Sequence, residues 1–571
     1  MRFSHLLLPL MAGALTLAAC TAPSAPGPAA APPPQEEAYP KTLLEAFKKK
    51  QTLQCDAGKE HWRSAGQPKR GGVFVRANTV GVAGQHLDVT AAGSSPIALP
   101  QVYNYLVRLR SCYYENSTLE PDLATSWQMA PDGKTWTFKL RNDIRWHNKP
   151  PVNGRPFTSA DVGWTIDYQK SDGSLRSYWI DVTHEEPDPQ TIVLKLREPD
   201  ADFLGKLAEN SNVMLPREVK EQLGGFKNAA IGTGPFLLKE FKPDNSSIVE
   251  RNLDWKELGV DGKPLPYIDE IKTIIFGDYT SEVAAMRSGQ IDLNRAQGFT
   301  KLDADVLKQS GLKLTAYDDT IAAVWGLYFN LSKKPFDDVR VRKAIALAID
   351  PLETIEGAYK GGALPTGFLS SAILQYAWPP EKALEKFKPD REAAKRLLAD
   401  AGYGPGQLRF TMDAGNIPTE APAAEITQKQ LAAVGIEAKI SPQNGAASTR
   451  LQSLTQDYEA VWTAWSPASF LPDRWMGAIV LGAGGSKNAI RISDPQVDRL
   501  ALAQAREVDP VKRKVIIDQL QDNLYSIMPF VPTASIGYYR FYSCRIQNMR
   551  SNTPNFNMAG VDHAWLDQGR C

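Results

Sequence analysis

Histidine and serine, the residue types that most often carry acid–base and nucleophilic chemistry, form no recognisable catalytic motif in this chain of 571 residues. No pair among the six histidines has the HExxH spacing, with which one face of a helix presents two ligands to zinc. No serine lies in a GxSxG turn, which exposes a nucleophile at the top of a sheet. We therefore expect a protein that is not an enzyme, with no catalytic residue, no cofactor and no metal site.

Two glycine-rich stretches have the composition, but not the spacing, of phosphate-binding loops. "IGTGPF" at 231–236 lacks the GxGxxG spacing, and "GAGGSK" at 482–487 lacks the GK[ST] ending. Both are predicted to be turns. The chain also has 65 Lys and Arg against 64 Asp and Glu. This balance argues against a nucleic-acid partner, because such binding depends on clustered positive charge.

Cys20 follows an apolar run at residues 6–19. The run is too short to cross the ~30 Å hydrocarbon core of a membrane as a helix. Its length and its small final residues are typical of an export signal with a cleavage site. "LAAC" at 17–20 resembles a lipobox, in which cleavage occurs before a cysteine that then receives lipid. We predict a signal peptide over 1–19 and lipidation of Cys20; the alternative is an ordinary signal peptide that happens to contain a cysteine.

Residues 21–40, after Cys20, consist largely of proline and alanine and contain no large aliphatic side chain. Such a segment cannot bury enough apolar surface to offset its ordering entropy, and proline favours an extended form. We predict a tether with an N-terminal extension over 20–66. Two or more acyl chains hold a protein on a membrane stably, so lipid alone is expected to anchor the body. Because the signal peptide directs export, the body is expected on the periplasmic side of a bacterial membrane.

Four further cysteines, Cys55, Cys112, Cys544 and Cys571, lie outside any CxxC motif. Disulfides persist in the oxidising compartment that an exported protein reaches. We therefore expect two disulfides. Four cysteines allow three pairings, among which the sequence cannot choose; Cys544–Cys571 and Cys55–Cys112 is the pairing we adopt.

Segments typical of strands and of helices alternate along the body. Trp136, Phe138 and Leu140 alternate with polar residues, which predicts a half-buried strand. In "DDVRVRKAIALAID" at 337–350 the apolar residues fall on one face of a helix, and Arg342 and its basic neighbours are predicted on the solvated side. Interleaved strands and helices in a chain this long predict α/β architecture divided into two or three lobes.

Six segments together resemble, in order, the motifs of the family 5 extracellular solute-binding proteins. This group contains the dipeptide-, oligopeptide- and nickel-binding components of ABC importers. The segments are "EPDLATSW", "PDGKTWTFKLRNDIRWHNKPPVNGRPFTSADV", "DPQTIVLKLREP", "IGTGPFLL", "FNLSKKPFDDVRVRKAIALAID" and "RLLADAGY". The resemblance spans about residues 70–545, which is nearly the whole body.

This resemblance implies an α/β, two-lobed periplasmic-binding-protein (Venus-flytrap) fold with an additional small α+β domain on lobe I. The implied layout places lobe I at 67–100, 213–312 and 529–571, the extra domain at 101–212 and lobe II at 313–528. The two lobes would close on a solute at a hinge, without catalysis.

The resemblance also points to ligand-binding residues in "YEAVWTAWSPASFLPDRW" at 458–475. Peptide-binding relatives have an aspartate here that receives the amino terminus of the ligand, whereas residues 463–467 of this chain contain no acid, and Asp473 is the nearest acid downstream. The residues expected to contact the ligand are Trp462, Trp465, Ser466, Asp473, Trp325, Ser94 and Ser95. The alternative for the tryptophans is packing in the core.

The function implied is that of an exported, monomeric receptor that delivers a peptide or peptide-sized solute to the permease of an ABC importer. The missing acid leaves room for a non-peptide solute, such as an opine, an oligosaccharide or a metal chelate. A periplasmic sensor or chaperone-like binding protein on the same scaffold is the alternative in another class.

Overall fold

The computed structural model describes residues 67–79, 87–88, 99–109, 119–172, 176–209, 212–294, 301–309, 314–320, 323–371, 373, 375–444, 446–452, 457–466, 469, 471–479, 488, 490–549 and 561–569. The chain divides into two compact units, Met1–Pro40 and Lys41–Cys571, and all described residues belong to the second. The predicted signal peptide and the residues Cys20, Cys55, Ser94, Ser95, Cys112 and Cys571 lie outside the described residues. Cys544 is disulfide-bonded, and its pairing stays a prediction.

Two apolar cores organise the second unit. The first core contains residues on both sides of the predicted boundary between lobe I and the extra domain, including Phe74 and Phe138. One of its sheets has the order β1-β10-β9-β8, and a second, antiparallel sheet has the order β4-β5-β7-β6. Trp136, Phe138 and Leu140 of the second sheet are buried in alternation, as their spacing predicts.

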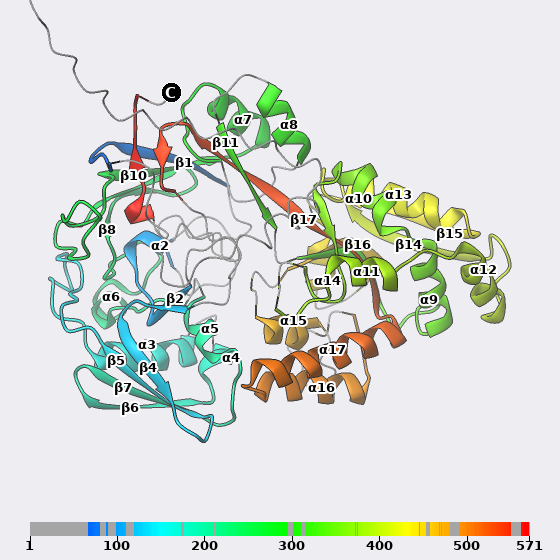
Figure 1. Cartoon of the computed structure of the whole chain (residues 1–571), viewed down its shortest axis with the longest axis horizontal. Coiled ribbons are helices and arrows are strands. Elements are labelled where there is room, and N and C mark those ends of the chain that lie inside the picture. Colours follow the sequence, from blue (N-terminus) through cyan, green and yellow to red (C-terminus); the bar gives the residue numbers. More distant parts are fainter. Residues whose placement is uncertain are drawn as a thin grey trace, which may run out of the picture. The chain divides into compact units, whose positions relative to one another are not determined.

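The strands around the first core are β1 (Val73–Thr79), β2 (Val107–Leu109), β3 (Leu119–Pro121), β4 (Ala124–Met129), β5 (Thr135–Leu140), β6 (Val182–Asp188), β7 (Thr191–Leu196), β8 (Phe236–Lys242), β9 (Ser246–Arg251), β10 (Glu270–Phe276), β18 (Ile546–Gln547) and β19 (Trp565–Leu566). The helices are α2 (Leu99–Val102), α3 (Ser159–Asp172), α4 (Arg176–Trp179), α5 (Phe203–Leu207), α6 (Arg217–Leu223), α7 (Tyr279–Arg287), α8 (Lys301–Gln309) and the 3-10 turn η1 (Val561–His563). Helix α3 packs on β6 and β7 (Figure 1).

The second core extends from Ala323 to Ile536 and surrounds a sheet of the order β11-β17-β12-β16-β14-β15, with β13 paired to β17. The strands are β11 (Leu314–Thr320), β12 (Val324–Phe329), β13 (Ala363–Pro365), β14 (Leu408–Gly415), β15 (Ile436–Gln443), β16 (Ala460–Trp465) and β17 (Phe530–Ser543). The helices are α9 (Val339–Ala348), α10 (Pro351–Tyr359), α11 (Pro380–Lys386), α12 (Arg391–Asp400), α13 (Ala421–Ala432), α14 (Ser448–Gln452), α15 (Pro472–Ile479), α16 (Pro495–Arg506) and α17 (Pro510–Ile527).

Helices α10, α16 and α17 each begin at an Asp-Pro pair. The side chains of Asp350, Asp494 and Asp509 accept hydrogen bonds from backbone amides of the first turn. Proline is favoured at the next position, because its fixed φ suits the helix and its missing N–H has no partner to lose there.

Arg342 on α9 corrects the sequence prediction, because it is buried rather than on a solvated side. Its guanidinium donates hydrogen bonds to the carbonyls of Phe336, Ile527 and Met528. The last carbonyls of a helix lack partners within that helix, so the end of α17 provides acceptors for this buried charge.

Strands β11 and β17 form an antiparallel ribbon between the two cores. Phe530 and Ile536, in the first half of β17, belong to the second core. Tyr542, near the other end of the strand, belongs to the first. In Figure 1, β17 runs from beside β16 toward β1. The predicted lobe boundaries at 312/313 and 528/529 fall immediately before these strands, although the three-part division itself stays a prediction.

Candidate functional site

The three predicted ligand-binding tryptophans lie on the two neighbouring strands β12 and β16. Trp462, Trp465 and Trp325 expose 0%, 4% and 3% of their surface. Val324 is opposite Trp465 in the ladder, and Trp325 is opposite Ala464. Because directly opposed residues share a face and successive residues alternate, Trp325 and Trp462 lie on one face of the sheet and Trp465 lies on the other.

Trp465 stands at the end of β16, next to the exposed Ser466. The indole nitrogens of Trp462 and Trp465 are both buried without a hydrogen-bond partner among the described residues. A buried donor without an acceptor is costly. Trp462 lies in the middle of the strand and Trp465 at its end, and both belong to the second core. Their role as ligand contacts stays a prediction.

Asp473, on the first turn of α15, has partners within the chain. Its carboxylate lies 3.0 Å from Lys206 Nζ, which also binds Asp200 at 2.7 Å. Its backbone N–H donates to Asp202 Oδ2 at 2.9 Å. Burial lowers the pKa of Lys206, but the charges of Asp473 and Asp200 outweigh burial and leave this pKa raised. Asp473 thus forms an ion pair with a lysine of α5. The role of Asp473 as a ligand contact stays a prediction.

A second ion pair lies beside the first and is almost fully buried. Arg513 of α17 donates to Asp202 Oδ1 at 2.5 Å, and the two side chains are 3% and 4% exposed. Arg513 also donates to Gln504 Oε1 on α16. We call Asp200, Asp202, Lys206, Asp473 and Arg513 the α5–α15–α17 cluster; it joins an element of the first core to two helices packed on the second.

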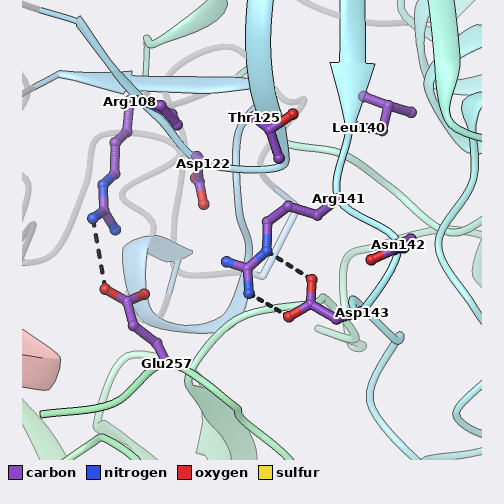
Figure 2. A pocket seen from close by; sticks show the side chains of 9 residues that line it. Arg108, Asp122, Thr125, Leu140, Arg141, Asn142, Asp143 and Glu257 are labelled. Carbon is purple, nitrogen blue, oxygen red and sulfur yellow. Dashed lines mark hydrogen bonds and ion pairs between the residues drawn. The ribbon is translucent and has the colours of Figure 1, made fainter.

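A separate cavity of about 560 Å³ opens beside β2, β4 and β5 (Figure 2). Arg108, Pro121, Asp122, Thr125, Leu140, Arg141, Asn142, Asp143 and Glu257 line it. Arg141 binds both oxygens of Asp143 at 2.9 and 2.7 Å. Arg108 lies 3.6 Å from Glu120 and 3.9 Å from Glu257, and these are ion pairs beyond the usual hydrogen-bond distance.

Asp122 is held rigidly at the edge of this cavity. Its two oxygens accept hydrogen bonds from Asn104 Nδ2 and from the backbone N–H of Tyr105, both at 2.8 Å. Burial raises the pKa of Asp122 to about 6, although Arg108 and the two hydrogen bonds act in the opposite direction.

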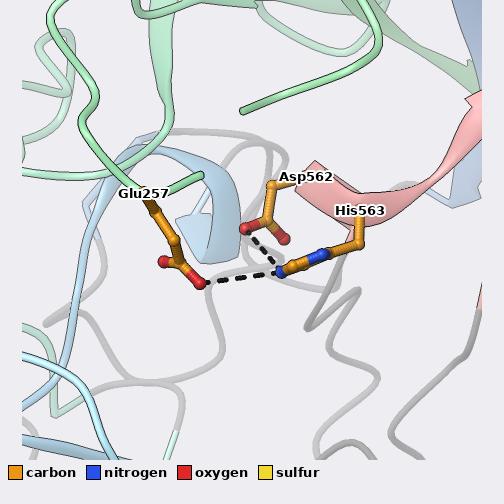
Figure 3. A group of neighbouring side chains, drawn as sticks. All are labelled: Glu257, Asp562 and His563. Atoms are coloured by element: carbon orange, nitrogen blue, oxygen red, sulfur yellow. Dashed lines mark ion pairs between the residues drawn. The ribbon is translucent and has the colours of Figure 1, made fainter. Parts of the chain in front are cut away.

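Glu257 extends this charged region to η1 (Figure 3). His563 Nε2 lies 3.6 Å from Glu257 and 3.8 Å from Asp562. Three such groups could hold a divalent cation. Burial lowers the pKa of His563, but the charges of Asp562 and Glu257 leave it raised, and Arg108 adds a positive charge next to Glu257. These observations favour a network of ion pairs over a metal site.

Residues 118–487 match the sequence family described as bacterial extracellular solute-binding proteins, family 5 Middle, and the match covers more than half of the 571 residues. The chain belongs to this family. It is therefore a solute-binding protein, as its six motifs predict.

Two relatives illustrate the range of family 5. Heme-binding protein A of Haemophilus influenzae is 26% identical over 480 residues, which cover 77% of this chain and 82% of that protein. Di/tripeptide-binding protein 1 of Pseudomonas aeruginosa is 26% identical over 475 residues, which cover 77% of this chain and 83% of that protein.

Solved structures of family 5 type share the fold. The periplasmic binding protein DppA from Helicobacter pylori, in complex with peptide STSA, has a TM-score of 0.70 and 23% identity, over 88% of this chain and 99% of that one. The dipeptide binding protein from Pseudoalteromonas sp. SM9913, in complex with Met-Leu, has a TM-score of 0.71 and 21% identity, over 87% and 100% of the two chains. The predicted α/β, two-lobed periplasmic-binding-protein fold is confirmed.

Within the described part of the chain, no helix combines the length and the apolar character that crossing a membrane requires.

Proposed function

We propose that this protein is the receptor of an ABC importer and that it binds a peptide or peptide-sized solute between its two lobes without altering it chemically. The observation that carries the proposal is the pair of apolar cores connected by the β11–β17 ribbon, in a chain of the solute-binding family. Relatives named for di- and tripeptides or dipeptides support the peptide class.

The ribbon supplies the mechanism of capture. A few residues of a two-stranded connection can absorb the rotation of one lobe against the other. A solute favours the closed form only to the extent that it contacts the closed form more than the open one. Trp465 and Ser466, at the end of β16, are the contacts we propose from the second lobe. Trp325 lies on the opposite face of the sheet and belongs to the second core.

The N-terminal segment completes the proposal. Lipid on Cys20 would hold the receptor on the periplasmic side of the membrane, close to its permease, and the 20–66 segment would let the monomeric body reach that partner. Mass spectrometry of the mature protein from its own host tests this directly. We expect acyl mass on Cys20 and its loss in Cys20→Ser; an unacylated mature chain would refute the anchor and leave the binding function standing.

Binding itself is tested by titration calorimetry and X-ray scattering with a panel of short peptides, haem and opines. We expect at least one solute class to bind, to reduce the radius of gyration and to be recovered unchanged after incubation. Trp465→Ala should weaken that binding, whereas Trp127→Ala, on the β4–β5 sheet, should not. If no class binds or changes the scattering, or if the solute is converted, the proposed function is wrong.

A further inference from the structure

Strand β17 has two parts, which pair with different cores. Residues Phe530–Ile536 pair with β12 and β13 on the side of the second core. Residues 541–543 lie instead beside the segment 292–294, which in turn lies beside β1 of the first core. Within the described part of the chain, residues 538–540 have β11 as their only strand partner. The strand therefore passes from one lobe to the other within these few residues.

The segment at 292–294 forms hydrogen bonds to β1 on one side and to β17 on the other. Asp292 N–H donates to the Val75 carbonyl at 2.6 Å, and Ser543 N–H donates to the Asp292 carbonyl at 2.8 Å. Asn294 Oδ1 accepts a hydrogen bond from Phe541 N–H at 2.8 Å. The segment thus acts as a short strand that joins the end of β17 to the sheet of the first core.

The carboxylate of Asp292 reinforces this junction. It is 2% exposed and accepts hydrogen bonds from Val75 N–H at 2.9 Å and from Ser543 Oγ at 2.8 Å. Arg545 Nε donates to it at 2.5 Å, and Arg545 Nη2 donates to the Val73 carbonyl at 3.2 Å. Charge-assisted hydrogen bonds are stronger than neutral ones, and separating a buried ion pair leaves uncompensated charges. The first-core end of the β11–β17 ribbon is therefore held firmly.

We infer that Asp292 is a positioning residue for lobe closure. Because it ties residues 541–543 to β1, this end of the ribbon moves with the first core, and the rotation is confined to residues 538–540 and their β11 partners at 317–319. A fixed axis leaves fewer open arrangements for the protein to lose when a solute closes the lobes. The inference rests on the proposed solute-binding function and adds what guides the closure.

Hydrogen exchange of the full, unaltered chain locates the axis. The probes are the short peptides, haem and opines of the binding panel, and single amides are resolved by mass spectrometry. A solute that reduces the radius of gyration should leave exchange at Phe541 and Ser543 unchanged, because their amides stay bound to the segment 292–294 in both forms. If these two amides exchange faster without solute while the amides of β1 do not, the ribbon separates from the first core on opening and the inference is wrong.

Variants separate positioning from stability. Asp292→Asn keeps the size of the side chain and removes its charge. We expect a larger radius of gyration without solute and an apparent affinity that is roughly two- to thirtyfold weaker. Asp161→Asn is the matched control, because Asp161 is also a buried carboxylate of the first core that binds an arginine, Arg155, at 2.7 and 2.9 Å. It should lower the unfolding midpoint to a similar degree and leave affinity and scattering unchanged.

Ser543→Ala is a milder variant that keeps the ion pair and removes one hydrogen bond to Asp292. It should show the same two changes to a smaller extent, and it decides the question if Asp292→Asn does not fold. If the variants at Asp292 and Ser543 bind and scatter like Asp161→Asn, Asp292 contributes to stability alone, and the inference fails while the proposed function stands. If no solute of the panel binds the unaltered chain, the proposed function fails and the inference fails with it.

Discussion

At the scale of single residues, His147 shows how burial fixes a protonation state. Its Nδ1 accepts from the backbone N–H of Gly232 at 3.3 Å, so the ring proton lies on Nε2, which donates to the Gly234 carbonyl at 3.0 Å. The contact with Gly232 needs the neutral ring, because a protonated Nδ1 has no lone pair to accept with. Burial lowers the pKa of His147 from 6.5 to about 4.

This depressed pKa makes a pH prediction. Below pH 6.5 His147 is protonated in the unfolded chain, whereas in the folded chain it stays neutral down to about pH 4. The stabilisation is therefore complete above pH 6.5 and is lost as the pH falls through this window, by about 3 kcal/mol in total. In urea unfolding, His147→Gln should have a shallower decline of the unfolding free energy over this window than the wild type. Parallel pH profiles of the two proteins would contradict the assignment.

Part of the candidate site could be predicted from the sequence, and part of it could not. The motif order is enough to identify the solute-binding family, because each motif is local. The cavity is not visible in this way, because Arg108, Asp122 and Glu257 come from separate segments. The same holds for Glu257 and His563, which are hundreds of positions apart. Asp473 could be found as the nearest acid, but its partner Lys206 could not.

At the scale of elements, the "IGTGPF" stretch is a close packing contact rather than a phosphate loop. A Cβ on Gly232 would lie 2.0 Å from the carbonyl oxygen of Val102 at the end of α2, and a Cβ on Gly234 would lie 2.7 Å from the Gln101 carbonyl. The Gly234 N–H donates to Val102 O at 2.9 Å. The backbones approach closely because neither glycine has a side chain.

Gly232→Ala should therefore destabilise the protein. The added methyl group meets backbone rather than a flexible side chain, so the segment has to move, and overpacking of this kind costs about 1–3 kcal/mol. Gly277→Ala is the matched control, because a Cβ there meets nothing within 4 Å. Thermal unfolding should show a clear fall for Gly232→Ala and a change within about 0.5 kcal/mol for Gly277→Ala. Equal unfolding midpoints for the two variants would contradict this prediction, because they would show that α2 moves away from the added methyl group at no cost in stability.

The sequence predicts an element correctly where local periodicity determines it. It does not predict features that depend on residues far away in the sequence. The alternation in β5 and the apolar face of α9 are both predicted correctly, since each depends on local spacing. Arg342 is the exception on α9, because the acceptors that bury it are carbonyls at the end of α17. The placement of Trp325 and Trp465 on opposite faces needs the register of β12 with β16, which the sequence does not state.

At the scale of the whole second unit, the chain connects its two cores by the β11–β17 ribbon and by the α5–α15–α17 cluster. The ribbon is continuous backbone and persists in any open form. The cluster consists of side-chain contacts between segments far apart in the sequence, such as Asp202 and Arg513. If the lobes separate around the ribbon, these contacts have to break, together with the hydrogen bond from Ala201 N–H to the Ala505 carbonyl and the Arg474–Glu209 ion pair.

The cluster should therefore tune solute affinity without contacting solute. Removing one partner of a buried ion pair leaves an uncompensated charge and costs roughly 3–5 kcal/mol, so Asp202→Asn penalises the form in which α5 meets α17. We expect a larger radius of gyration in X-ray scattering without solute and a weaker apparent affinity. Replacing both charges, as in Asp202→Asn with Arg513→Gln, should recover part of the loss, because no lone charge remains buried.

Lys333→Gln is the control, since its exposed pair with Asp457 lies wholly in the second-core region. If Asp202→Asn unfolds more easily but binds and scatters like the wild type, the cluster contributes to stability alone and closure depends on the ribbon and the solute.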